Sequence, residues 1–202
     1  MHRRNLSVGK QILSMILLTS LSVFSVLVSA NAANENEALK QSIANSMSQL
    51  LSKLNENKSI YRSDASVFFH DLDIELSHVI DFKRVALKVM GRNVRTATDL
   101  QRDQFISIFK RSLFETYANV LLGSDEVEFD VLNANINSRN SNKAKVNLVI
   151  KGAGGANYEV SYAMHRGKDL IYRVENIIVL GVNLGLAFKD RFQQQLYLYK
   201  GD

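Results

Sequence analysis

The spacing of the apolar residues changes at Gly123, and this change limits the folds that the chain can adopt. Before Gly123 the apolar residues recur at steps of three and four, which is typical of amphipathic helices. Between residues 127 and 179 they alternate with polar residues, as in strands with one buried face. Helical spacing returns after residue 184. The order predicts an α+β fold, in which N-terminal helices and a C-terminal helix pack on a curved, roughly four-stranded antiparallel sheet.

Two of the predicted helices have recognisable ends. Asp81 is a good N-cap for a helix over residues 82–90, and Gly91 is placed to end it. Thr98 and Gln101 have the spacing of a capping box, and the helix that they begin stops at Gly123. Three further helices are predicted over residues 39–54, 65–76 and 184–199.

Four strands are predicted over residues 127–131, 144–150, 158–164 and 170–179. Their short polar or glycine-rich connections favour antiparallel hairpins. One connection, "KGAGGANY" from Lys151 to Tyr158, also resembles a phosphate-binding loop. Such a loop leads from a strand into a helix, whereas this one leads into another alternating segment, so a hairpin turn is the better interpretation.

The first 32 residues are predicted to be a secretory signal peptide, cleaved near Ala32. Arg3, Arg4 and Lys10 precede an apolar run over residues 12–28, and small residues follow. Residues 33–202 are then expected to form a single domain. Without the leader, basic residues fall from 25 to 22 against 20 acidic ones, so the net charge falls from +5 to +2. An exported, nearly neutral chain is not expected to bind nucleic acid.

The sequence contains no pattern typical of a catalytic or metal site. "HDLDIE", from His70 to Glu75, groups one histidine with three acids, but the spacing does not place His70, Asp71 and Asp73 on one helical face. Common hydrolase and metalloprotease motifs are missing, and the chain has no cysteine. We therefore expect no catalytic residue, no metal and no cofactor.

Two segments resemble the MlaC family, also called the toluene-tolerance family of periplasmic phospholipid-binding proteins. The first runs from Val79 to Gly123 and the second from Tyr172 to Leu196. Tyr172 stands where the family usually has Trp, and Asn93 and Val94 replace a common aromatic pair. The matching positions are Asp81-Phe82, Met90-Gly91, Thr98, Gln101-Arg102, Phe105, Thr116-Tyr117-Ala118, Gly181, Val182, Leu184, Arg191 and Phe192.

The resemblance implies a periplasmic phospholipid carrier that acts as a monomer and performs no catalysis. Its implied partners are an outer-membrane lipoprotein complex and an inner-membrane ABC transporter with a lipid-binding ring. Phospholipid is then a cargo of the protein and not a cofactor.

A carrier must hide the lipid's tails from water, so we expect an apolar cavity between the sheet's concave face and helices 82–90 and 99–121. Arg92, Arg95 and Arg102 are candidates for contact with the head group at the entrance, although ordinary solvated charge is an equally good interpretation. The residues expected to line the cavity are Val85, Val89, Met90, Leu113, Tyr117, Val146, Leu148, Tyr162 and Val182.

Two other functions fit the same order of elements. A cone-shaped, isomerase-like enzyme would need a buried acid or histidine among the inward positions of the strands. A periplasmic chaperone would expose a broad apolar patch in place of a closed cavity.

Overall fold

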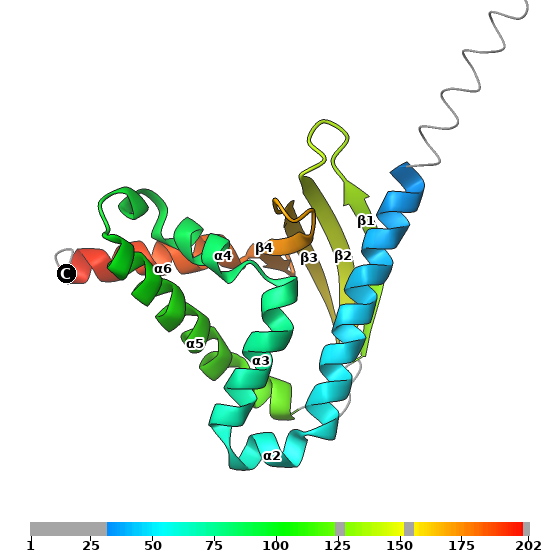
Figure 1. Ribbon diagram of the computed structural model, residues 1–202, viewed down its shortest axis with the longest axis horizontal. Coiled ribbons are helices and arrows are strands. Elements are labelled where there is room, and N and C mark those ends of the chain that lie inside the picture. Colours follow the sequence, from blue (N-terminus) through cyan, green and yellow to red (C-terminus); the bar gives the residue numbers. More distant parts are fainter. Residues whose placement is uncertain (1–31, 124–127, 152–155, 200–202) are drawn as a thin grey trace, which may run out of the picture.

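The computed structural model describes residues 32–123, 128–151 and 156–199, and its elements follow the order that the sequence predicts (Figure 1). The predicted signal peptide, apart from Ala32, lies outside the described residues. So do Val127 at the start of the first predicted strand and residues 152–155 of the glycine-rich connection.

The helices before the sheet are more numerous than predicted. A short helix, α2, follows the long N-terminal helix, and its Tyr61 is buried with only 3% exposed. None of the described helices combines the length and apolar character that crossing a membrane requires. The helices are the N-terminal helix (residues 32–56), α2 (Lys58–Ser63), α3 (Ala65–Val79), α4 (Phe82–Met90), the 3₁₀ helix η1 (Gly91–Arg95), α5 (Asp99–Gly123) and α6 (Leu184–Leu198).

The predicted helix ends are confirmed by their hydrogen bonds. The Asp81 carboxylate accepts the Arg84 N–H at 2.9 Å and so caps α4. Thr98 Oγ1 accepts the Gln101 N–H at 3.2 Å, while Gln101 Oε1 accepts the Thr98 N–H at 2.9 Å. Gly91 ends α4 with φ +60° and ψ −126°, a conformation that residues with a Cβ rarely adopt.

The sheet is fully antiparallel, with its strands in chain order. A fifth strand of two residues extends the four that were predicted. The fourth strand begins two residues later than predicted, because Leu170 has φ +63° and lies with Ile171 in the turn before it. The strands are β1 (Glu128–Ile136), β2 (Lys143–Lys151), β3 (Asn157–Arg166), β4 (Tyr172–Val179) and β5 (Val182–Asn183).

The helices contact the sheet in two places, one under the N-terminal helix and one at β4. The N-terminal helix packs Leu39 and Ile43 against one face of the sheet, and Val146 in β2 is fully buried there. Helices α4, α5 and α6 form a second group beside the sheet (Figure 1). Within it, the rings of Phe109 and Phe188 lie 5.6 Å apart, edge to face. A third cluster joins the two groups, because Leu54 of the N-terminal helix packs with Phe82 of α4 and Phe114 of α5.

Gly91→Ala is expected to destabilise the protein by about 1–3 kcal/mol, because alanine must adopt a sparsely populated backbone conformation at this position. A Cβ there would also lie 3.1 Å from Lys189 Cε. Chemical denaturation of Gly91→Ala, with and without Lys189→Ala, separates the two causes. Full recovery of stability in the double variant would contradict the backbone explanation.

Candidate functional site

An apolar cavity of about 170 Å³ lies where the helical group meets β4. It is enclosed by the end of α3, one side of α4, the middle of α5, the beginning of α6 and the centre of β4. Its lining residues are Leu76, Ile80, Phe82, Val85, Phe109, Leu113, Phe114, Val174, Asn176, Ile177, Leu184, Gly185 and Phe188.

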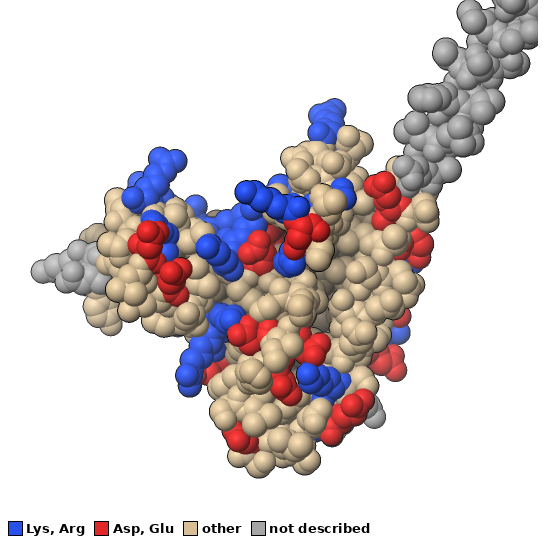
Figure 2. Space-filling model, in the orientation of Figure 1, with Lys and Arg blue, Asp and Glu red and all other residues tan. Residues whose placement is uncertain are grey.

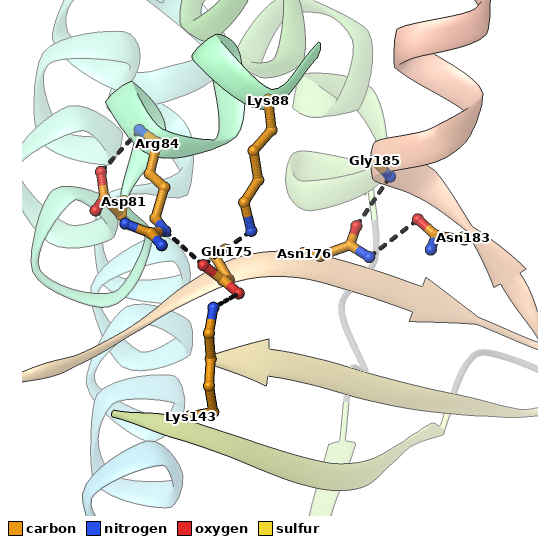
Figure 3. A network of polar contacts seen from close by, with 8 residues as sticks. All are labelled: Asp81, Arg84, Lys88, Lys143, Glu175, Asn176, Asn183 and Gly185. Atoms are coloured by element: carbon orange, nitrogen blue, oxygen red, sulfur yellow. Dashed lines mark hydrogen bonds and ion pairs between the residues drawn. The ribbon is translucent and has the colours of Figure 1, made fainter. Parts of the chain in front are cut away.

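The one polar side chain in this wall, Asn176, is engaged by its neighbours. Its Oδ1 accepts the Gly185 N–H at 3.0 Å, and its Nδ2 donates to Asn183 Oδ1 at 3.0 Å (Figure 3). Asn183 in turn caps α6 by accepting the Leu186 N–H. A Cβ on Gly185 would collide with the Asn176 side chain, so glycine is needed for this close approach. The amide therefore holds α6 against β4, and the cavity itself is apolar.

Two of the residues predicted to line a cavity, Val85 and Leu113, line this one. Val89 is buried between α4 and α5, and Met90 is buried at the end of α4. Val182 is 57% exposed on the edge strand β5, so the prediction that it points inward is wrong. The side chain of Tyr117 lies outside the part of the chain that the structure describes. The three sheet residues Val146, Leu148 and Tyr162 do not border the cavity.

Two of these sheet residues, Val146 and Tyr162, lie under the N-terminal helix. Val146 is buried in the cluster that Leu39 and Ile43 complete, and Tyr162 packs against that cluster. Leu148 is only 1% exposed. The cavity thus lies where the helical group meets β4, away from the three predicted sheet residues. Lipid contact remains a prediction for every one of these residues.

The three arginines predicted near the entrance have different surroundings. Arg102 donates from Nη1 to the carbonyl oxygens of Val94 and Ala97 at 2.7 and 2.5 Å, and from Nη2 to Asp99 at 2.5 Å. Its guanidinium therefore fixes the turn between η1 and α5. Arg92 and Arg95 are exposed on η1.

A buried carboxylate that the sequence analysis missed lies beside the cavity. Glu175 on β4 is only 7% exposed and is contacted by three cations, from Arg84 and Lys88 on α4 and from Lys143 on β2 (Figure 3). Its Oε2 accepts from Arg84 Nε at 2.5 Å and lies 2.8 Å from Lys88 Nζ, and its Oε1 accepts from Lys143 Nζ at 2.5 Å. We call these four residues the Glu175 cluster.

A bulge in β4 gives Glu175 its position. The pairing with β3 steps from Ala163 opposite Asn176 to Met164 opposite Val174, so Glu175 has no partner across the strands. Bulges turn a side chain away from the regular alternation. Val174 and Glu175 are accordingly both buried, although they are neighbours in a strand. The sequence signal that could have revealed the site is a glutamate within the apolar run "VENIIV".

The three cations keep Glu175 ionised. Burial raises the pKa of its carboxyl group, but hydrogen bonds from Lys143, Lys88 and Arg84 outweigh this effect and lower the pKa from 4.5 to about 2. A carboxylate with this pKa is a poor proton acceptor near neutral pH. Glu175 is therefore suited to holding positive charge in place and not to acid–base catalysis.

The acids of "HDLDIE" make contacts within the helical layers. Asp71 accepts from Tyr61 Oη at 2.7 Å, and Asp73 accepts from Lys110 Nζ at 2.7 Å. Glu75 accepts from Lys53 Nζ at 2.9 Å. In the described part of the chain, no three histidine or acidic residues are grouped in a way that could hold a metal ion.

Comparison with known proteins shows which chains share this sequence and fold. The sequence profile of the MlaC protein family matches residues 44–198. The chain is 33% identical over 148 residues to the toluene tolerance protein ttg2D of Pseudomonas putida, a match that covers 71% of this chain and 66%, just under two thirds, of that protein. A phospholipid-binding protein from Ralstonia solanacearum, solved in complex with a phospholipid, has a similar fold. The TM-score is 0.72 at 19% identity, covering 80% of this chain and 89% of that one.

Glu175→Gln is expected to destabilise the protein by about 1–3 kcal/mol near neutral pH, since it leaves three cations close together without their anion. The folded-state pKa lies below the unfolded one, so the carboxylate's contribution is present above pH 4.5 and is lost as the pH falls towards 2. Unfolding free energies of the two proteins should therefore converge over that interval. Glu115→Gln, in an exposed pair with Arg111, is the control, with an expected loss of at most about 1 kcal/mol. A difference between Glu175→Gln and the unmodified protein that did not change with pH would contradict this account.

Proposed function

The chain belongs to the MlaC family, and on this basis we propose that it is a phospholipid carrier whose cavity receives the acyl chains. The apolar wall of the cavity is the observation that carries the proposal. A diacyl lipid has about thirty methylenes, and exposing them to water costs roughly 20 kcal/mol at about 0.8 kcal/mol each. A carrier must remove most of that surface from water, and a wall without free hydrogen-bonding groups is suited to this.

The cavity has to enlarge when it receives a diacyl lipid. Its volume of about 170 Å³ is smaller than the roughly 300–1,000 Å³ of most ligand pockets. Strand β4 is held by hydrogen bonds to β3, α4 by ion pairs with Glu175, and α6 by the hydrogen bond of Gly185 with Asn176. Helix α5 contacts α4 and α6 through apolar side chains. Outward movement of α5 is therefore the route to a larger cavity that leaves the contacts of α4 and α6 with β4 in place.

The proposal includes a place of action and partners. In it, the protein works in the periplasm as a monomer, after removal of the signal peptide near Ala32. It takes phospholipid between an outer-membrane lipoprotein complex and an inner-membrane ABC transporter with a lipid-binding ring. Membership of the family supports these assignments. Release requires a partner that opens the cavity, because hydrocarbon buried on this scale leaves into water only slowly.

The buried acid Glu175 does not support the isomerase-like alternative. Glu175 is not among the residues that line the cavity, and its pKa of about 2 makes it a weak base. The cavity wall holds no acidic residue and no histidine. A carrier without catalytic activity fits these residues better.

Protein purified without detergent is expected to carry phospholipid at close to one molecule per chain. Lipid extraction followed by phosphorus analysis measures the ratio, and mass spectrometry identifies the lipid. Protein that had folded correctly and yielded no lipid would contradict the proposal. Binding of denatured polypeptide by such lipid-free protein would favour the chaperone alternative.

Leu113→Trp is expected to lower the amount of bound lipid several-fold, because the larger side chain fills part of the cavity. Ile108→Trp is the matched control, since Ile108 lies on the same helix but is 68% exposed. Lipid per chain and thermal unfolding are measured for both variants. Equal lipid content in two folded variants would show that this cavity is not where the acyl chains bind.

A further inference from the structure

The Glu175 cluster contains more positive charge than its carboxylate can neutralise. Three cations surround one anion, so the four side chains together carry a charge of +2. Asp81 adds one negative charge nearby, since its carboxylate accepts the Arg84 backbone N–H (Figure 3), and the net charge with Asp81 included is still +1. A single carboxylate needs fewer partners than this, and the surplus can hold a second anion.

The three cations have more hydrogen-bond donors than Glu175 uses. An ammonium group has three N–H donors and a guanidinium group has five. Among the described residues, each of these side chains makes a hydrogen bond or ion pair only with Glu175. Arg84 uses its Nε, and each lysine uses its Nζ for one contact. The side chains of Arg84, Lys88 and Lys143 are 35%, 48% and 38% exposed, so an anion from solution can reach them.

The cluster lies directly beside the cavity wall. Val85 follows Arg84 in the sequence, and Val174 and Asn176 flank Glu175. Val85, Val174 and Asn176 all line the cavity. On this face, basic side chains lie among acidic ones where the helical group meets the sheet (Figure 2). A molecule with apolar chains in the cavity could therefore place an anionic group among the three cations.

We propose that Arg84, Lys88 and Lys143 form a binding site for a phosphate group beside Glu175, and that the phosphate is that of the bound phospholipid. This inference rests on the proposed carrier function. It places the head group at α4 and β4, away from Arg92, Arg95 and Arg102. Guanidinium and ammonium groups are the usual protein partners of phosphate.

The first test uses inorganic phosphate and the purified protein, with binding followed through backbone amide shifts in NMR spectra. Phosphate is expected to shift amides in α4 and β4, and Lys88→Gln combined with Lys143→Gln is expected to weaken binding by about tenfold. The matched control combines Lys83→Gln with Lys145→Gln, which lie on the same helix and strand but are exposed and outside the cluster. Equal weakening in both double variants would overturn the site.

Glu175→Gln gives a result that a purely structural role would not produce. Removing the carboxylate releases three cations, so phosphate is expected to bind about tenfold more tightly to this variant than to the unmodified protein. Circular dichroism shows whether the variant is folded under the conditions of the titration. Unchanged or weaker phosphate binding by folded Glu175→Gln would overturn the inference.

The second test distinguishes a lipid's phosphate from free phosphate. Dihexanoyl phosphatidylglycerol and dihexanoyl glycerol share their tails and differ in the phosphate-containing head group. The unmodified protein is expected to prefer the phospholipid by about tenfold, and the Lys88→Gln, Lys143→Gln double variant should lose that preference while still binding both. Phosphatidylglycerol should also displace inorganic phosphate from the cluster.

The outcomes separate this inference from the carrier function. If the double variant keeps the preference for phospholipid, the head-group site is wrong and the carrier function stands. If phosphate binds at the cluster but is not displaced by phosphatidylglycerol, the site serves a free anion and the inference is overturned. If the unmodified protein binds neither lipid, the carrier function fails and the head-group assignment fails with it.

Discussion

A charged carboxylate buried at the boundary between sheet and helices is the constraint on which the arrangement depends. Removing an ionised glutamate from water is costly unless cations and hydrogen bonds replace its hydration. Two of the cations that contact Glu175 come from α4 and one comes from β2. These ion pairs therefore hold α4 against the sheet. Because α4 also supplies Phe82 and Val85 to the cavity wall, the same ion pairs determine where the apolar space lies.

The helices and strands could be predicted because their signals are local. A cap such as Asp81, or the reciprocal pair of Thr98 and Gln101, requires only residues within one turn of the chain. The short helix α2 was missed because its burial depends on Tyr61 packing with Phe68, in the following helix, and not on a repeated apolar spacing. The family resemblance was also readable from the sequence, since it rests on motifs in fixed order.

The cavity could be predicted only in part, because its position depends on which helix covers which face. Periodicity shows that Val146 and Leu148 point to one side of a strand, but not that the N-terminal helix occupies that side. Glu175 was missed for a related reason. Strict alternation assigns adjacent residues to opposite faces, and the bulge that buries both Val174 and Glu175 arises from pairing with a distant strand.

The composition of the cavity wall has a consequence for the range of cargo. Its residues come from four helices and only one strand, and no backbone ladder joins those helices to one another. Small shifts of α5 can therefore adapt the enclosed space to tails of different length or unsaturation. As the proposed carrier, a protein built in this way should discriminate poorly among acyl compositions, so a cell could alter its membrane fluidity without needing a different protein to handle the altered lipids.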